Sequence, residues 1–270
     1  MSRPWRRWAG VVPAVTVTIV LFGGALAGAV RASLQPDPFS GAYTLSAWRS
    51  VVTDAAFRDA VAFTLVTTVA ATVLSVVLAL PVAAALRGRA WARTVAALPV
   101  LVPHLLVAIL AVLWLGPGGL ADRLLGGMPL DVVRSRSGVG IVLVYVAKEV
   151  PFLALLLLAA WDDDIAAREE AAAVHGAGPV ARFRHVVVPG LRGPLTLGTL
   201  VVAAFVFGSF EVPLLVGPTQ PDTIATYALR VTRIADLSGR ADAAAALLVA
   251  TAGSVLLAVV AGATVRRHRA

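Results

Sequence analysis

The chain has 270 residues, of which 59% are hydrophobic and 14% are charged, and its mean hydropathy is +0.87. A water-soluble domain of this length needs about 25% charged residues to cover its surface, so most of this surface does not face water. The net charge of +8 does not indicate nucleic-acid binding, because the arginines flank apolar stretches instead of forming one stripe, and the lack of cysteine excludes disulfides and cysteine metal sites.

Six apolar stretches are long enough to cross a membrane as helices, which takes about 20 residues each. In chain order they are 9–30, 60–86, 94–121, 137–160, 193–217 and 243–265. This pattern predicts an all-α fold, a polytopic transmembrane helical bundle with six transmembrane helices. The first stretch follows three arginines, as the apolar part of a signal peptide does. It is longer than the roughly 7–15 residues of such a peptide, so we expect an uncleaved span.

The distribution of arginine predicts the orientation of these spans. An even number of spans places both termini on the same side, together with the short turn at 87–93 and the long loop before the fifth span. That side collects more arginines than the other. Because cytoplasmic loops carry the excess of basic residues, we predict a multi-pass protein of the cell membrane (inner or plasma) with both termini cytoplasmic. Segment 31–58 would lie outside, with a short amphipathic piece at 48–57.

The loop between the fourth and fifth spans carries strong helix signals. Three aspartates at 162–164 suit a helix start, where carboxylates meet free N–H groups and the positive end of the helix dipole. Strong helix formers follow, and Gly176 and Gly178 should end this helix. A second short helix at 180–185 is expected next, and Pro189 should reset the chain before the fifth span. An amphipathic linker and a docking surface both fit, but a loop so long and so helix-prone favours a docking surface.

Part of this loop resembles the EAA loop of permeases from binding-protein-dependent ABC importers, whose pattern is E-A-A-x3-G-x9-I-x-L-P. The matching residues are Glu170, Ala171, Ala172, Gly176, Val186, Val188 and Pro189. The two valines stand where isoleucine and leucine are usual, which is a conservative departure. Residue type, spacing and position before the penultimate span all agree with the family.

The resemblance implies a type I ABC importer permease fold, in a transport subunit that is not itself an enzyme. Its core would be 57–265, preceded by an N-terminal transmembrane helix and external loop at 1–56 and followed by a basic tail at 266–270. Within the coupling loop at 161–194, a coupling helix at about 164–178 would sit in a groove of a separate ATPase. The residues implied in this coupling are Glu170, Ala171, Ala172, Gly176, Gly178 and Pro189.

The family also implies partners. ATPase subunits would bind ATP and Mg²⁺, and no cofactor is expected in this chain, which lacks the G-x-x-x-x-G-K-[ST] phosphate loop and whose only lysine is Lys148. A second permease copy or a paralogue, an extracytoplasmic substrate-binding protein and membrane lipid complete the expected set. Nucleic acid is not expected.

Charged residues inside the spans are candidates for a translocation path or for a buried pair that fixes packing. Lys148 and Glu149 are neighbours in the fourth span, so they should meet partners on other helices: Glu211 for Lys148, and an arginine or hydroxyl for Glu149. Gly208 should loosen the fifth span near Glu211. His104 is expected to form an interhelical hydrogen bond, and since none of the four histidines has metal-site spacing, no metal site is expected.

Segment 207–218 also resembles permeases of the polyamine, iron and thiamine branch, and an acidic path lined by Glu149 and Glu211 would suit a cationic solute. The alternative function is an ion-gradient-driven secondary transporter or channel, in which the same charges would carry ions; it predicts two similar halves, and none are seen. An intramembrane protease would need a catalytic pair, for which Lys148 and Ser209 are the only candidates. The EAA-loop match favours the importer permease, and no catalytic residue is expected.

Overall fold

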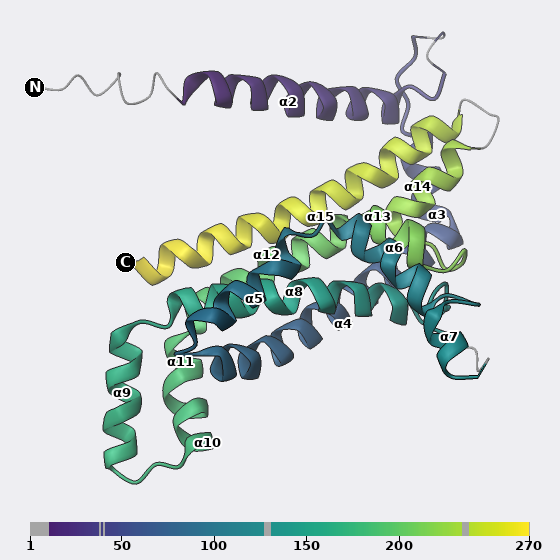
Figure 1. Ribbon diagram of the computed structural model, residues 1–270. Coiled ribbons are helices and arrows are strands. Elements are labelled where there is room, and N and C mark those ends of the chain that lie inside the picture. The colour runs from purple at the N-terminus through teal and green to yellow at the C-terminus, as the bar shows by residue number, and fades with distance from the viewer. Residues whose placement is uncertain (1–10, 38, 40, 127–130, 234–237, 270) are drawn as a thin grey trace, which may run out of the picture. The chain divides into compact units, whose positions relative to one another are not determined.

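The computed structural model describes residues 11–37, 39, 41–126, 131–233 and 238–269, and within these ranges it contains helices and no strand (Figure 1). The first half of the chain forms α2 (Val12–Leu34), α3 (Ser46–Thr53), α4 (Ala55–Leu86), α5 (Ala90–Leu101), α6 (His104–Leu115), α7 (Leu120–Leu124) and α8 (Val139–Ala160). The second half forms α9 (Asp163–Val174), α10 (Pro179–Arg182), a π-helical turn at Phe183–Val187, α11 (Val188–Gly190), α12 (Arg192–Gly208), α13 (Glu211–Val216), α14 (Ile224–Thr232) and α15 (Ser238–Arg269).

Five segments of the described chain are long and apolar enough to cross a membrane unaided. They are Val12–Leu34, Ala55–Leu86, His104–Leu124, Val139–Ala160 and Gly239–Thr264. A sixth candidate is the pair Pro179–Gly190 and Arg192–Gly208, which is bent by 70°. The predicted all-α, multi-pass fold is confirmed, and the number of spans reaches the predicted six when this pair is counted.

The third predicted span is not one helix. We expected a continuous helix over 94–121, but α5 ends at Leu101 and α6 begins at His104. Pro103 causes the break, because proline lacks the N–H that would continue the helix and forces the preceding residue into an extended conformation. Val102 has this conformation, with φ −77° and ψ 127°. The break therefore leaves a C-terminal helix end at Leu101 and an N-terminal helix end at His104.

The chain groups into two compact units. One unit comprises Met1–Arg58 and Tyr227–Val249, and the other comprises Asp59–Thr226 and Ala250–Ala270. In the first unit the predicted amphipathic segment forms α3, whose Trp48 donates a hydrogen bond to Ser33 Oγ at 3.2 Å. The predicted organisation into 1–56, 57–265 and 266–270 remains a prediction.

Tyr227 ties the start of α4 to α14 within the first unit. Its hydroxyl donates a hydrogen bond of 2.7 Å to Asp54 Oδ2. Burial, together with the neighbouring Asp54 carboxylate, raises the pKa of Tyr227, so the phenol keeps the proton that it donates.

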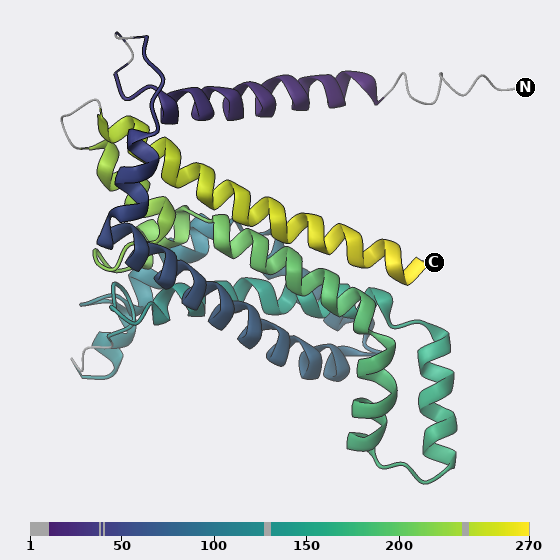
Figure 2. The same cartoon turned by 180° about the vertical axis from the view of Figure 1, so that it is seen from behind.

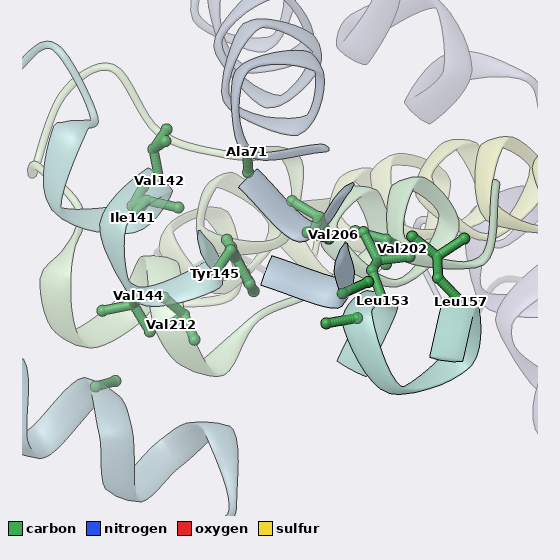
Figure 3. Packing of buried hydrophobic residues seen from close by; sticks show 14 of the residues in the cluster. Ala71, Ile141, Val142, Val144, Tyr145, Leu153, Leu157, Val202, Val206 and Val212 are labelled. Carbon is green, nitrogen blue, oxygen red and sulfur yellow. The ribbon is translucent and has the colours of Figure 1, made fainter. Parts of the chain in front are cut away.

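The core of the second unit lies between α8 and α12. Tyr145, Leu153 and Leu157 of α8 are buried against Val202 and Val206 of α12 (Figure 3). The four- and eight-residue spacings along α8 place its three residues on one face, and the four-residue spacing along α12 does the same. This packing holds the middle of α8, which carries Lys148 and Glu149, inside the bundle.

A glycine lets α15 approach α12 closely in the second unit. A side chain at Gly253 would collide with the Phe207 ring, whereas one at Gly262, on the same helix, would meet nothing within 4 Å. We therefore expect Gly253→Val to destabilise the protein by about 1–3 kcal/mol through overpacking. The thermal unfolding of the protein in lipid nanodiscs measures this, with Gly262→Val as the matched control. Equal melting temperatures for the two variants would contradict the close approach.

Candidate functional site

The loop between α8 and α12 forms a helical hairpin. Figures 1 and 2 both show α9 and α10 side by side, beyond the ends of α8 and α12. Asp162 caps α9 by accepting a 3.0 Å hydrogen bond from the Ile165 N–H, as the aspartate cluster predicted. Ile165 itself is buried against Gly190 and so anchors the base of α9 to α11.

Gly176 ends α9 in the way that the sequence predicts. It adopts φ +83°, which is favourable for glycine and strained for most other residues. Its N–H bonds to the carbonyl of Ala173 at 2.9 Å, and the Ala177 N–H bonds to the carbonyl of Ala172 at 3.0 Å. These two bonds form a Schellman motif, which satisfies carbonyls left free at the end of a helix.

The chain after Gly178 is more helical than predicted. We expected a short helix at 180–185 and a reset at Pro189, but the chain stays helical from Pro179 to Gly190 and bends only before α12. Pro189 lies inside this continuous stretch, as the second residue of α11. The wider π-helical turn just before it accommodates the proline ring, which would clash with the carbonyl four residues earlier.

The end of the hairpin presents exposed apolar side chains. Val174 is 86% exposed and Val180 is 79% exposed, and both lie next to the turn that contains Gly176. Of the residues implied in coupling, Ala172 is half-buried, whereas the exposed ones are Glu170, Ala171, Gly176, Gly178 and Pro189. The structure therefore gathers the predicted coupling residues on one exposed hairpin.

A second cluster of predicted residues lines a cavity of about 210 Å³ in the second unit. Its lining comprises Val100, His104, Lys148, Glu149, Phe152, Val201, Val202 and Phe205. Three of the four charged or titratable residues singled out in the spans thus meet here. Glu211 is not among the lining residues: it is exposed, at the start of α13. The predicted break before it is present, because α12 ends at Gly208.

We predicted that Lys148 pairs with Glu211, and this prediction is wrong. Its ammonium donates hydrogen bonds to the backbone carbonyls of Pro99, Val100 and Val102, the second at 3.3 Å. The last carbonyls of α5 have no N–H partner within the helix because the chain breaks at Pro103. An ammonium group has three donors and can satisfy three such carbonyls, and its charge is favourable at the negative end of a helix.

Glu149 meets the other side of the same break. Its Oε1 lies 3.0 Å from Nε2 of His104, the first residue of α6. The predicted arginine or hydroxyl partner is therefore wrong, and the predicted interhelical hydrogen bond of His104 is confirmed. The carboxylate is favourable near the positive end of α6. The positive charge of Lys148 thus stabilises the negative C-terminal end of α5, and the negative charge of Glu149 stabilises the positive N-terminal end of α6.

Aromatic side chains complete this cavity, and they were not among the predicted site residues. The Phe205 ring lies 4.6 Å from the His104 ring, between centroids. Phe152 lines the cavity one helical turn after Lys148. That four-residue spacing was a usable signal, since such residues share a helix face. No comparable signal connects Phe205 to His104, which lie on different helices.

A wider cavity of about 580 Å³ lies in the same unit, beside the second and third turns of α4 and the residues that precede α8. It is lined by Asp59, Ala62, Phe63, Val66, Arg136, Ser137, Gln220 and Pro221. Arg136 and Asp59 form no ion pair with each other among the described residues, and Arg136 is exposed. This cavity therefore offers a cation, a carboxylate, hydrogen-bonding groups and one aromatic ring to a polar molecule.

The chain resembles known transport proteins over nearly its whole length. No protein-family model matches the sequence. It is 30% identical over 292 residues to the sn-glycerol-3-phosphate transport system permease protein UgpA of Yersinia enterocolitica, covering 99% of this chain and 96% of that protein. UgpA of Salmonella typhi is 28% identical over 272 residues, 92% of each chain.

A solved structure shares the fold. A chain of a bacterial alginate ABC transporter, crystallised in complex with an alginate pentasaccharide-bound periplasmic protein, superposes with a TM-score of 0.73. The match covers 97% of this chain and 94% of that one, at 19% identity. At this identity the likeness concerns the fold alone.

Proposed function

This chain belongs to the permease family of type I ABC importers, and we propose that within such an importer it conducts a polar, anionic solute, driven by a separate ATPase. Membership makes it a multi-pass membrane subunit of a transporter and not itself an enzyme. The ion-gradient-driven alternative loses support, because two of the three charges that it would use as ion carriers, Lys148 and Glu149, are held at helix ends.

One observation carries the coupling role: the hairpin of α9 and α10. Its first helix is capped at Asp162 and closed by a Schellman turn at Gly176. The hairpin leaves Val174 and Val180 exposed, so it is an ordered surface that the described part of the chain does not cover. Exposed apolar residues rimmed by charge mark protein interaction sites. We assign this surface to the ATPase, with Glu170 facing a basic residue of the groove. ATP and Mg²⁺ would bind in the ATPase subunits.

The other expected partners follow from the same assignment. A second permease copy or a paralogue would complete the translocation path, and a substrate-binding protein would deliver the solute from outside. The ion pair between Arg87 and Glu169 supports the predicted orientation, because it brings the arginine-rich turn at 87–93 to the same end of the bundle as the hairpin. That end, with both termini, would be cytoplasmic.

The solute we propose is a phosphorylated polyol or an acidic sugar. The expected polyamine, iron or thiamine class is corrected, because the relatives are named for sn-glycerol 3-phosphate. The acidic path that suggested a cation is also missing from the small cavity, where Glu149 is bonded to His104 and Lys148 lines the same wall. In the wide cavity, Arg136 would bind the anionic group. The Asp59 carboxylate would accept hydrogen bonds from the hydroxyls, to which Ser137 and Gln220 would also bond. We place the path along these two cavities.

Uptake by proteoliposomes that contain the permease, its ATPase and its binding protein tests this proposal. We expect ATP-dependent uptake of sn-glycerol 3-phosphate in preference to spermidine. Arg136→Gln should lower that uptake about tenfold or more, since a hydrogen bond to a charged group contributes about 1.5–3 kcal/mol. Arg58→Gln is the control, because Arg58 is an exposed neighbour of Asp59 that does not line the cavity. Preference for spermidine would exclude the anionic class, and uptake without the ATPase would exclude the importer.

A further inference from the structure

Arg87 contacts two separate parts of the coupling apparatus at once. It directly follows α4, which ends at Leu86. Its guanidinium forms an ion pair with Glu169 of α9, and it lies over the ring of Trp161, 4.5 Å from the ring centroid. The side chains of Arg87 and Glu169 are only 33% and 23% exposed. One residue therefore joins the end of α4, the end of α8 and the middle of α9.

The covalent connections of α9 are bent at both ends of the hairpin. Trp161, with φ −82° and ψ 84°, interrupts the helix between α8 and α9. On the other side, the chain turns by 70° between α11 and α12. A force applied to α9 can be absorbed by rotation at these two bends. Apart from the packing of Ile165 on Gly190 at its base, α9 needs a further contact to move as one body with the spans.

We propose that Arg87 is a positioning residue for coupling: it fixes α9 to the ends of α4 and α8, so that displacement of α9 moves these two helices. This inference rests on the coupling role proposed for α9. Arginine suits the position because its planar guanidinium can bind a carboxylate and stack on an aromatic ring at the same time, whereas a lysine would keep the charge and lose the stacking.

A purely structural contact would have different consequences. A part-buried ion pair that only stabilised the fold would, when removed, reduce the amount of assembled transporter and lower uptake and ATP hydrolysis together. A contact that transmits motion leaves the complex assembled and lets the ATPase turn over while less solute moves. The number of solute molecules taken up per ATP hydrolysed distinguishes the two.

The experiment compares Arg87→Gln with Arg89→Gln in the complete transporter with its binding protein. Arg89 is exposed, lies two residues away and belongs to none of the ion pairs among the described residues, so its variant matches the loss of charge. We expect Arg87→Gln to lower uptake per ATP about fivefold or more, within the usual range of coupling between sites. Arg89→Gln should leave it unchanged. The exchange Arg87→Glu with Glu169→Arg should recover part of the ratio, because it restores the ion pair but not the stacking.

Two outcomes would overturn this role. In one, Arg87→Gln lowers assembly, uptake and ATP hydrolysis in proportion; in the other, it leaves uptake per ATP unchanged. Glu170→Lys, measured alongside, separates this from a failure of the proposed function. If Glu170→Lys uncouples transport and Arg87→Gln does not, α9 couples without the help of Arg87; if neither does, the coupling role of α9 itself is wrong.

Discussion

Charge reversal at Glu170 is expected to abolish ATP-driven uptake while the permease remains folded in the membrane. Glu170 is exposed on α9 and belongs to none of the ion pairs among the described residues, whereas its neighbour Glu169 is held by Arg87. Its carboxylate is therefore available to a partner. Reversing a charge that faces a basic groove costs several kcal/mol, so Glu170→Lys should reduce uptake by more than about tenfold. Uptake per ATP and the amount of ATPase that co-purifies measure the effect.

The location of this surface can be checked without disturbing it. The chain has no cysteine, so a single Val174→Cys change introduces one thiol at the end of the hairpin, where the side chain is exposed. The thiol should react with a membrane-impermeant reagent from the cytoplasmic side and be protected when the ATPase is bound. The uptake by Glu170→Gln, which removes the charge without reversing it, should lie between the uptake by wild type and that by Glu170→Lys. Labelling from outside the cell would contradict the assignment.

The coupling hairpin was predictable because its signals are local. A capping aspartate, a glycine at the helix end and a proline in a first turn each act within a few residues, and Asp162, Gly176 and Pro179 do so here. The apolar length of the spans is a local signal too. The break after Gly208 belongs to the same class, since it follows from one residue that weakens a helix.

The partners of the buried charges were not predictable in the same way. Matching opposite formal charges led from Lys148 to Glu211, but the ammonium instead binds backbone carbonyls that Pro103 leaves free. Pro103 was visible in the sequence. Its effect on Lys148, however, depends on the packing of α5 against α8. A backbone acceptor carries no mark in the sequence, so side-chain matching cannot find it.

Contacts between distant segments were missed for a related reason. The pair of Arg87 and Glu169 joins residues 82 positions apart, and nothing in the spacing of either segment points to the other. The predicted boundary of the coupling helix was correct to within a few residues, yet the contact that fixes this helix to the spans needed the folded chain. The local signals thus predicted where the proposed coupling surface lies, whereas the contact that holds it was missed.

Lys148→Met is expected to destabilise the permease and to stop transport, because it removes the donors at the break in the third span. Methionine has a similar length and no charge, so the carbonyls of Pro99, Val100 and Val102 would stay buried without their donor. Each buried acceptor left unsatisfied costs about 1–3 kcal/mol, and relief from burying an ammonium offsets part of the sum. We expect a net loss of about 3 kcal/mol in the free energy of unfolding. Thermal unfolding in lipid nanodiscs measures it.

The direction in which Lys148→Met shifts the melting temperature distinguishes a structural role of Lys148 from a role in the translocation path. If burying the charge cost more than the three carbonyls gain, Lys148→Met would unfold at a higher temperature than wild type, as happens when some buried ionic groups are replaced by apolar ones. Ala147→Met, at the adjacent exposed position of α8, controls for the introduced side chain. A lower melting temperature for Lys148→Met alone, with uptake lost, would mean that the ammonium holds the end of α5 in the position that shapes the cavity. A melting temperature unchanged or raised, with uptake lost, would instead place the charge of Lys148 in the path itself.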